Sequence, residues 1–327
     1  MIKDILSYQK TFQAYLQKYI QSLQNKQPRE LYLPIQYILD SEAKHIRPIL
    51  CLMACEMYGQ KYIHALPAAL SVELFHTFSL IHDDILDNSP VRRGKKTIHN
   101  KWNTNIAILS GDVLLVESYK ILSAYTPDKT HALLNTLTSA SVEICEGQQE
   151  DMNFEKKNIV SSEQYIEMIR KKTSVLIGTS LRMGTIVANA PLTEQRKMYQ
   201  IGENIGLAFQ IMDDYLDTFG NTKNFGKKIG NDILTNKKTF LLTKAMEIAD
   251  KKEFSNIQKA LKMPPTKEKI KTFQNIYKSL NIDKITLSTA EQYHQKLIRL
   301  IKKLNVNNTA TLQKLTILSE QLINRTK

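Results

Sequence analysis

The sequence contains few cysteines and no long apolar run. Its 327 residues include three cysteines, Cys51, Cys55 and Cys145, an odd set without the pairing of a zinc site. We therefore expect buried, reduced thiols rather than a metal site or disulfides. No stretch approaches the roughly 20 apolar residues of a transmembrane helix, and the opening MIKDILSYQK lacks the apolar core of a secretory signal. These absences predict a cytoplasmic protein with no transmembrane segment.

Glycine and proline are also scarce, with 11 and nine residues, and no short alternating runs are bounded by turn dipeptides. Apolar residues instead recur at spacings of three and four, the period of an amphipathic helix. Pro67 and Pro191 lie near expected helix starts, where proline is tolerated. The sequence therefore predicts an all-α fold. The helical segments that we expect are 4–24, 47–58, 68–87, 105–124, 130–149, 161–189, 194–218, 238–250 and 284–303.

Negative charge is scarce in the last quarter of the chain. The formal net charge is +13, and residues 251–327 contain 16 Lys and Arg against five Asp and Glu. Such a surplus can attract an anionic substrate, a membrane surface or nucleic acid. Nucleic-acid sites interleave basic residues with stacking aromatics, which are sparse here. We expect a lysine-rich solvated surface and no nucleic-acid partner.

What the sequence does contain is a repeated acidic motif. The same D-D-x-x-D spacing occurs in SLIHDDILD at 79–87 and in FQIMDDYLD at 209–217. In each copy the first and last aspartates are one helical turn apart, so they share a face, with the middle aspartate beside them. Carboxylates this close repel one another, and Mg²⁺ is typically held by one or two carboxylates plus substrate phosphates. The candidate metal ligands are Asp83, Asp84, Asp87, Asp213, Asp214 and Asp217.

A pair of matched acidic motifs is hard to reconcile with simpler roles for these aspartates. An exposed acidic helix face explains one motif but not a matched pair, and an EF-hand would need a loop with a central glycine. His82 beside Asp83 suggests an HD-type metal-dependent phosphohydrolase, which leaves the second motif unused. If both motifs serve one chemistry, they must meet in space. We therefore expect a single domain over residues 1–327.

Basic residues follow both acidic motifs. Arg92 and Arg93 come just after the first motif, and Lys227, Lys237 and Lys238 follow the second. Guanidinium groups bind phosphate through two parallel hydrogen bonds, and lysine binds it as a point charge. Carboxylates, metal ions and cationic side chains together predict a site that clamps a diphosphate.

These motifs resemble those of the trans-isoprenyl diphosphate synthases, or polyprenyl synthetases, and the resemblance runs from about residue 30 to 245. The family's D-D-x-x-D followed by R-R-G matches residues 83–87 and 92–94, and its second motif matches 213–217. The resemblance implies the isoprenoid synthase fold, a bundle of mostly antiparallel helices around a central apolar cavity. It also implies a homodimer and three Mg²⁺ ions bound with an allylic diphosphate.

The resemblance assigns expected roles to single residues. Those that resemble ligands of isopentenyl diphosphate are Lys44, Arg47, His76 and Arg93. Those that resemble ligands of the allylic diphosphate are Arg92, Lys172, Lys227 and Lys237. Those that resemble polar groups near the developing carbocation are Thr173 and Gln210.

Four positions depart from the family pattern. Glu42 and Ala43 replace a Gly-Gly pair before Lys44, and Lys96 replaces a proline after the R-R-G motif. Asn236 replaces the usual glycine before Lys237. None of these changes removes a charged ligand, so we expect them to alter loop geometry rather than activity.

The implied reaction is head-to-tail prenyl transfer to isopentenyl diphosphate from dimethylallyl, geranyl or farnesyl diphosphate. Metal ions and cationic side chains stabilise the departing diphosphate, the isopentenyl double bond attacks the allylic cation, and the departing diphosphate removes the final proton. The family relates product length to the residues five and four before Asp83, here Phe78 and Ser79. This pair predicts a C20 product, with C15 as the alternative.

Two further functions share the same fold. A terpene cyclase or head-to-head synthase lacks the isopentenyl site, so Lys44, Arg47 and His76 argue against that class. A regulatory subunit without catalysis has no need of intact aspartates in both motifs.

Overall fold

The computed structural model describes residues 5–220 and 230–323. The chain divides into two compact units. Unit 1 consists of Met1–Ala140, Thr179–Tyr199 and Leu304–Leu315, and unit 2 consists of Ser141–Gly178, Gln200–Lys303 and Thr316–Lys327. The single domain expected from the sequence stays a prediction.

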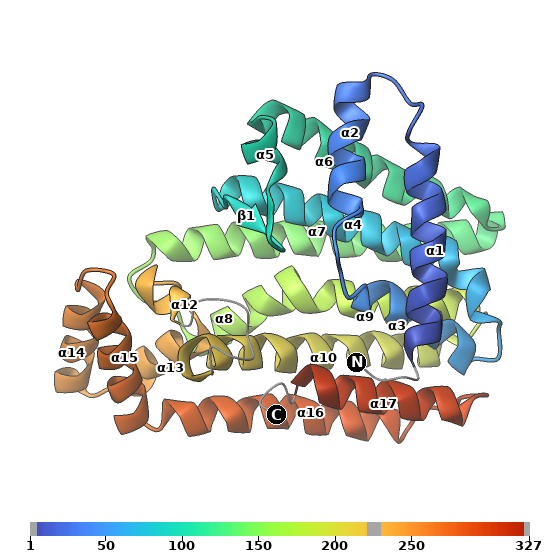
Figure 1. Cartoon of the computed structure of the whole chain (residues 1–327). Coiled ribbons are helices and arrows are strands. Elements are labelled where there is room, and N and C mark those ends of the chain that lie inside the picture. Colours follow the sequence, from blue (N-terminus) through green and yellow to red (C-terminus); the bar gives the residue numbers. More distant parts are fainter. Residues whose placement is uncertain (1–4, 221–229, 324–327) are drawn as a thin grey trace. The chain divides into compact units, whose positions relative to one another are not determined.

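Unit 1 is built around helix α4 (Leu66–Leu86), which packs against α3 (Ile46–Met57) and α6 (Thr104–Lys120) (Figure 1). Helix α2 (Arg29–Leu39) packs against α6, and α1 (Leu6–Ser22) packs against α3 and α4. The segment 68–75 of α4 is buried around its whole circumference, as expected of a helix covered by neighbours on all sides. Two short 3₁₀ turns, η2 (Tyr62–Ala65) and η3 (Ile121–Ala124), precede α4 and follow α6.

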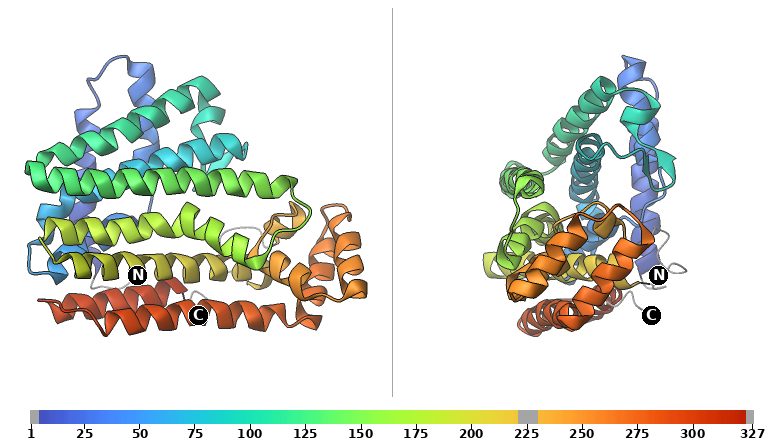
Figure 2. Two further views of the ribbon diagram at one scale, coloured as in Figure 1. Left: turned by 180° about the vertical axis from the view of Figure 1, so that it is seen from behind. Right: turned by 90° about the vertical axis from the view of Figure 1, so that its left-hand side faces the viewer.

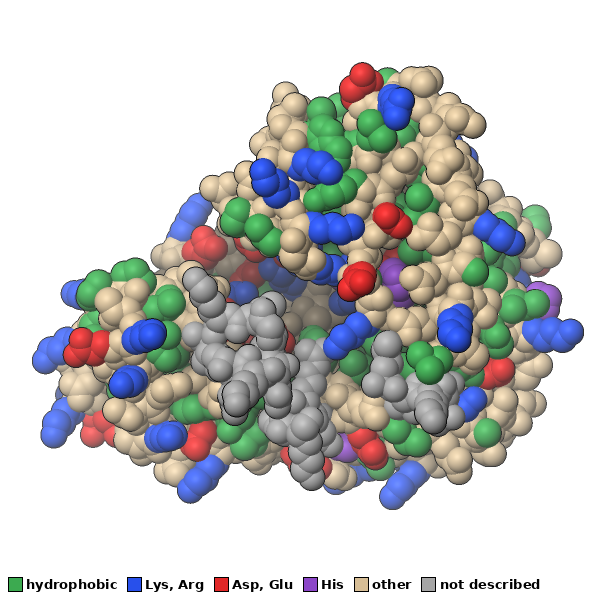
Figure 3. Space-filling model, in the orientation of Figure 1, with side chains coloured by type: hydrophobic (Ala, Val, Ile, Leu, Met, Phe, Trp, Pro, Cys, Tyr) green, Lys and Arg blue, Asp and Glu red, His purple; other side chains and the backbone are tan. Residues whose placement is uncertain are grey.

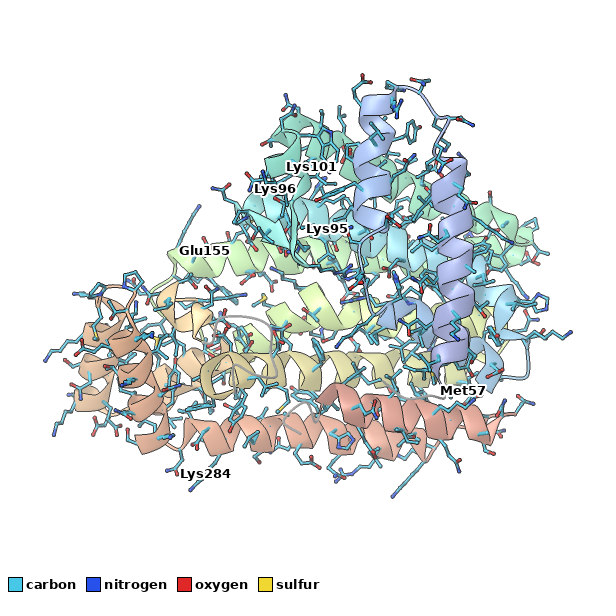
Figure 4. The ribbon with its side chains drawn as sticks, in the orientation of Figure 1. Met57, Lys95, Lys96, Lys101, Glu155 and Lys284 are labelled. Atoms are coloured by element: carbon cyan, nitrogen blue, oxygen red, sulfur yellow. The ribbon has the colours of Figure 1, made fainter. Side chains whose placement is uncertain are left out.

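A short hairpin in unit 1 follows the first aspartate motif. Strand β1 (Val91–Arg92) pairs antiparallel with β2 (Lys95–Lys96). The two turn residues, Arg93 and Gly94, have φ values of 52° and 74°, and a two-residue type I′ hairpin requires positive φ at both positions. The glycine of the R-R-G motif is therefore explained by the turn. Three lysines of this hairpin and of the following α5 (Ile98–Lys101) are labelled in Figure 4: Lys95, Lys96 and Lys101.

Unit 2 packs α13 (Phe240–Ile248) against α8 (Ser162–Ile169) and α16 (Ile282–Ile301). Helix α15 (Lys267–Ser279) contacts α14 (Lys251–Leu261), α16 and the short α12 (Asn231–Leu234). Both views in Figure 2 show α14 and α15 side by side, in orange. Leu241, Ala245, Ile257, Phe273 and Tyr277 form part of the buried core of this unit.

Several helices contribute residues to both units: α7 (Pro127–Lys156), α9 (Val175–Val187), α10 (Leu192–Phe219) and α17 (Thr309–Ile323). Each of the nine segments predicted from periodicity is mainly helical in the structure. Pro67 lies in the first turn of α4, and Pro191 directly precedes α10, as predicted. The helices α2, α14, α15 and α17 and the short helices α5 and α12 were not predicted. Helix α2 contains Pro34, and α14 and α15 bury only narrow faces within lysine-rich sequence.

The basic C-terminal region has the solvated surface that its composition predicted. Most lysines of α14 and α15 are exposed, and in Figure 3 blue side chains alternate with red ones where Figure 1 places these helices. In the described part of the chain, no helix is long and apolar enough to cross a membrane. The cytoplasmic location stays a prediction.

The cysteine prediction was partly wrong. Cys51 and Cys55 are buried free thiols of α3, as expected, but Cys145 is exposed. It lies on the same open face of α7 as Val142, which is also exposed.

Candidate active site

The first aspartate motif ends helix α4 of unit 1. Asp83 and Asp84 lie in its last turn, and Asp87 is its C-cap. The middle aspartate, Asp84, is 3% exposed, whereas Asp83 is half-buried and Asp87 is exposed. The two outer carboxylates therefore remain within reach of a cation, and the middle one is directed into the protein.

Arg92 supplies a counter-charge to this first motif. Its Nε donates to Asp84 Oδ1 at 2.7 Å, and its Nη2 lies 3.8 Å from Asp83 Oδ2. Burial raises the pKa of Asp84, and the Arg92 guanidinium opposes that rise. The hairpin brings Arg92 back to the helix end, and Thr97 Oγ1 closes the intervening loop by donating to Ser89 O at 2.8 Å.

Arg47 and His76 form a cationic cluster in the same unit. Arg47 Nη1 donates to His76 Nε2 at 3.1 Å. Burial, together with the charges of Arg47 and Arg93, holds the pKa of His76 well below its usual range, so the neutral ring keeps a donor at Nδ1. Burial lowers the pKa of Arg47 to about 10, which leaves it charged at neutral pH. Arg47 Nε is buried without a hydrogen-bond partner in the described residues, so the cluster fits an anionic ligand.

Glu73 and His45, which the sequence did not single out, support this cluster. Glu73 Oε1 lies 2.8 Å from His45 Nδ1, and both side chains are buried. The Glu73 carboxylate also attracts the guanidinium groups of Arg47 and Arg93, and Arg93, His45 and Glu73 line one recess. An acidic residue within the apolar run of α4 was the available sequence signal. Lys44 is exposed in the loop before α3.

His82 does not form a metal site with Asp83. Its ring packs against the Phe78 ring, with 4.7 Å between centroids, and its Nε2 lies 3.3 Å from Ile108 O on α6. Gly111 of α6 makes room for it, because a Cβ there would collide with the His82 ring. This packing argues against an HD-type phosphohydrolase and places Phe78 on the side of α4 that carries His82.

The second aspartate motif lies near the end of α10, in unit 2. Asp214 is 4% exposed, and Asp213 and Asp217 are half-buried. Asp214 Oδ2 accepts from the Tyr165 hydroxyl at 2.5 Å and from the Phe240 N–H at 3.0 Å. The middle aspartate therefore joins α8 and the start of α13 to α10, and the outer pair again stands closer to solvent.

Asp232 adds a carboxylate to this second cluster. Its N–H donates to Asp217 Oδ2 at 3.0 Å. Burial and the negative charge of Asp232 raise the pKa of Asp214 to about 7 and that of Asp217 to about 6. The G-N-D sequence at 230–232 was the signal that would have indicated this residue. Carboxyl groups with raised pKa values in one cluster favour an incoming cation.

The turn η4 (Arg170–Ser174) between α8 and α9 is π-helical, and it carries Lys172 and Thr173. Lys172 Nζ donates to Asp151 Oδ2 of α7 at 2.7 Å. Gly147 and Gly206 flank the turn, because a Cβ at either position would lie within 2.6 Å of its backbone. These glycines let α7 and α10 approach a turn type that often occurs at functional sites.

The other predicted residues of unit 2 lie around Asp214. Gln210 is one turn earlier on α10, and its Nε2 donates to Asp214 Oδ1 at 3.2 Å, which leaves Oε1 as an acceptor. Lys237 is exposed between α12 and α13, and its N–H donates to Asp232 O at 2.9 Å. Lys227 lies outside the described residues.

The outer aspartates of each motif fit a divalent cation. Within residues 5–220 and 230–323, no group of three or more His, Cys, Asp or Glu side chains is arranged to hold a metal alone. Mg²⁺, however, usually binds one or two carboxylates together with substrate phosphates. Each motif offers such a pair one helical turn apart. The meeting of the two motifs stays a prediction, since they belong to different units.

The chain matches the family model described as polyprenyl synthetase over residues 28–280. It is 39% identical over 227 residues to a geranylgeranyl pyrophosphate synthase of Geoglobus acetivorans, covering 69% of this chain and 71% of that one. It is 31% identical over 303 residues to a geranylgeranyl diphosphate synthase of Sulfolobus acidocaldarius, covering 91% and 92%. A solved geranylgeranyl pyrophosphate synthase has a TM-score of 0.93 at 39% identity, over 100% of both chains.

The chain belongs to the polyprenyl synthetase family. The all-α isoprenoid synthase fold is confirmed by the solved relative. The predicted class of activity, a trans-prenyltransferase of isoprenoid biosynthesis, is confirmed with the family. The roles of single residues, the number of metal ions and the homodimer stay predictions.

Proposed function

We propose that this trans-prenyltransferase condenses isopentenyl diphosphate head-to-tail with allylic diphosphates and releases mainly C20 geranylgeranyl diphosphate. The observation that carries this proposal is the half-buried Arg47–His76 pair, with its buried, unmatched donor at Arg47 Nε. A cyclase or a head-to-head synthase does not bind isopentenyl diphosphate and has no need of this pair. The C20 product is supported by the printed names of the relatives from Geoglobus and Sulfolobus.

Isopentenyl diphosphate is bound in unit 1. Arg47 and Arg93 supply guanidinium donors, His76 donates through Nδ1, and Lys44 reaches the ligand from the loop before α3. The Glu73 carboxylate attracts the two arginines and partly neutralises their charge while the anion is absent. These residues neutralise the isopentenyl diphosphate, which does not leave during the reaction.

The allylic diphosphate is bound by Arg92, Lys172, Lys227 and Lys237, with metal ions held by the outer aspartates of both motifs. Mg²⁺, when bound, supplies the positive charge that favours departure of the diphosphate; three ions are expected. Arg92 and the lysines add fixed positive charge around the same oxygens. Lys172 is kept in place by Asp151.

Thr173 and Gln210 stabilise the allylic cation. The Gln210 amide is oriented by the hydrogen bond from its Nε2 to Asp214, so its Oε1 presents partial negative charge. Thr173 is held in the π-helical turn beside Lys172. After carbon–carbon bond formation, the departed diphosphate accepts the proton, since none of the named side chains is a free base next to that carbon.

We propose that Phe78 limits the length of the product. Its ring packs between Phe75 and His82, with centroid distances of 5.5 and 4.7 Å. Ser79 is small and donates to His76 O at 2.9 Å, so it leaves the chain path open. One bulky and one small residue favour C20 over C15. We also propose that the enzyme acts as a cytoplasmic homodimer, with a single domain around an apolar chain cavity.

A product assay tests the proposed function. The purified protein is incubated with radiolabelled isopentenyl diphosphate, Mg²⁺ and dimethylallyl, geranyl or farnesyl diphosphate in turn, and dephosphorylated products are separated by chromatography. We expect C20 alcohol from each primer and none after chelation of the metal. A C15 end product would show that the enzyme makes farnesyl diphosphate, the alternative product. A cyclic hydrocarbon or no product would contradict prenyl transfer. Light scattering that shows a monomer mass at micromolar concentration would contradict the homodimer.

A further inference from the structure

Lys269 is an exception among the lysines of α14 and α15. It is only 1% exposed, whereas the other lysines of these helices and of the link between them are exposed: Lys251, Lys252, Lys259, Lys262, Lys267, Lys271 and Lys278. An ammonium group removed from water needs strong compensation. A buried lysine in such a solvated region therefore indicates a specific role.

The Lys269 ammonium is held by neutral oxygens. Its Nζ donates to Asn236 Oδ1 at 2.7 Å and to Leu261 O at 3.3 Å. Burial lowers the pKa of Lys269, which means that these acceptors do not fully replace water. The buried charge lowers the stability of the fold. Its hydrogen bond to Asn236 fixes the position of that side chain.

Asn236 stands where the family usually has glycine, and its backbone explains that preference. Its φ is 56°, in the left-handed region that glycine adopts freely and asparagine tolerates better than most residues. Both ends of its amide are fixed, because Oδ1 accepts from Lys269 and Nδ2 donates to Leu261 O at 3.2 Å. The side chain thus holds the backbone in a conformation that glycine reaches without help.

Asn236 belongs to a short segment that connects the second aspartate motif to Lys237. The Lys237 N–H donates to Asp232 O at 2.9 Å, and the Asp232 N–H donates to Asp217 Oδ2 at 3.0 Å. Helix α15 contacts this segment at its other end too, since a Cβ at Gly230 would lie 2.6 Å from Ile270 Cδ1. Adjacent residues of α15 therefore support both ends of the segment 230–236.

We propose that Lys269 is a positioning residue for the allylic diphosphate site, and that it acts by locking Asn236 so that Lys237 points at the ligand. The inference rests on the proposed function, because the role of Lys237 comes from that proposal. The buried lysine and the asparagine together replace the family's glycine. Lys269 itself touches no substrate.

The first test is Lys269→Met, which keeps the length of the side chain and removes the charge. We expect the KM for farnesyl diphosphate to rise about tenfold, the size expected if the displaced Lys237 loses one charge-assisted hydrogen bond to the diphosphate. The KM for isopentenyl diphosphate should stay within about twofold, since that ligand is assigned to unit 1. Lys271→Met, on the same helix but exposed, is the matched control and should change neither constant. Equal rises in both KM values would indicate general destabilisation and overturn the proposal.

The second test is rescue by glycine. In Lys269→Met/Asn236→Gly, the backbone reaches the left-handed conformation without an anchor, and the Asn236 side-chain oxygen that would lack a donor is removed as well. We expect most of the lost farnesyl diphosphate affinity to return. A double variant as impaired as Lys269→Met alone would overturn the proposal. If Lys269→Met does not fold, Asn236→Ala provides a second test, because it keeps the lysine and disfavours positive φ at residue 236. It should raise the KM for farnesyl diphosphate but not the KM for isopentenyl diphosphate.

Binding of inorganic diphosphate separates this inference from the proposed reaction. Calorimetry with inorganic diphosphate and Mg²⁺ requires no turnover. If wild-type protein makes no prenyl product, the proposed function fails. The positioning role would still predict that the Lys269→Met variant binds diphosphate about tenfold more weakly than wild type and the Lys271→Met control. Equal affinities would contradict the positioning role, whatever the reaction.

Discussion

The two aspartate motifs share one spacing but differ in the groups that surround them. In both, the middle aspartate is buried and the outer pair lies closer to solvent. In unit 1 the middle aspartate, Asp84, receives the Arg92 guanidinium. In unit 2 its counterpart, Asp214, receives a tyrosine hydroxyl and a backbone N–H, with Asp232 nearby.

This difference means that the same motif carries unequal net charge. Arg92 partly neutralises the first cluster, whereas in the second cluster burial and the added negative charge of Asp232 raise the pKa values of Asp214 and Asp217 to about 7 and about 6. The first cluster is thus partly compensated by the protein itself. The second depends more on cations that arrive with the substrate. Variants that remove a charge from one of the two clusters test this difference in net charge.

The largest effect should follow removal of an outer aspartate from either motif. We expect Asp83→Ala and Asp213→Ala each to lower turnover by at least about 10²-fold, as for loss of a major electrostatic contribution to the transition state. Steady-state rates at saturating Mg²⁺ measure this. Asp128→Ala, an exposed acid at the start of α7, is the control and should be near normal. Near-normal turnover in either motif variant would remove the metal role from that motif.

A smaller but selective effect should follow removal of the counter-charge in unit 1. Arg92→Leu leaves Asp84 buried without its cation and removes a ligand of the allylic diphosphate. We expect kcat/KM for farnesyl diphosphate to fall about tenfold to 10²-fold. Because the pKa of Asp84 should then rise further, the loss should be greater at pH 6 than at pH 8.

Arg92→Lys sharpens that test. Lysine keeps the charge but cannot reproduce the bond from Arg92 Nε to Asp84, so partial activity is expected. Lys96→Gln, on the neighbouring strand and exposed, serves as the control. If Arg92→Leu shows no pH-dependent loss, the counter-charge role is wrong, and the two motifs are electrostatically alike.

The aspartates, the arginines and most helices could be predicted because they depend on local spacing. The five residues of D-D-x-x-D define one helical face. The long helices follow from apolar residues that recur at spacings of three and four residues. The supporting contacts could not be predicted in this way. Glu73 meets Arg47 and Arg93 from distant positions, and Asp232 acts on Asp214 only through folding.

The π-helical turn at Arg170–Ser174 shows a second limit of sequence patterns. Periodicity predicted one helix over 161–189, and the structure breaks it into α8, η4 and α9. The extra residue of a π turn leaves the apolar spacing almost unchanged. Gly147 and Gly206, which make space for the turn, lie on other helices. Only the fold shows that these glycines and Lys172 belong together.

The motifs also differ in the residues before them, which bears on product length. Phe78 lies five residues before Asp83, whereas Ala208 lies five residues before Asp213. We expect Phe78→Ala to lengthen the main product by one or more C5 units. Loss of a buried ring usually costs about 3–5 kcal/mol, but this position is half-buried and a prenyl chain would fill the space, so the cost should be smaller. Chromatography of dephosphorylated products measures the change.

The opposite change provides the control for product length. Ser79→Phe adds bulk one residue closer to the motif and should shift the product toward C15. The first condensation should be little affected in either variant, since no diphosphate ligand changes. An unchanged product distribution in folded Phe78→Ala would mean that another residue limits the chain, and the C20 assignment would lose that support.

The smallest effect is on stability and concerns Asp214. A carboxyl group with a raised pKa binds its proton more tightly in the folded than in the unfolded protein. Its ionisation therefore lowers stability as the pH rises above the ordinary pKa of an aspartate, about 3.9. The loss is complete above the folded pKa of about 7. Asparagine carries no charge, so Asp214→Asn should remove this loss. Its carbonyl oxygen can still accept from Tyr165 and Phe240.

We therefore expect Asp214→Asn to be more stable than wild type at pH 8 without metal, by about 1 kcal/mol or a Tm rise of about 2 °C. The difference should vanish near pH 4, where both side chains are neutral. Mg²⁺ with inorganic diphosphate should stabilise wild type more than the variant, because a ligand stabilises the state that binds it. Asp84→Asn provides the comparison. Burial raises the pKa of Asp84 too, but the Arg92 guanidinium opposes that rise, so this variant should raise Tm at pH 8 by less than Asp214→Asn does. If both variants raise Tm equally, the electrostatic difference between the two motifs is not real.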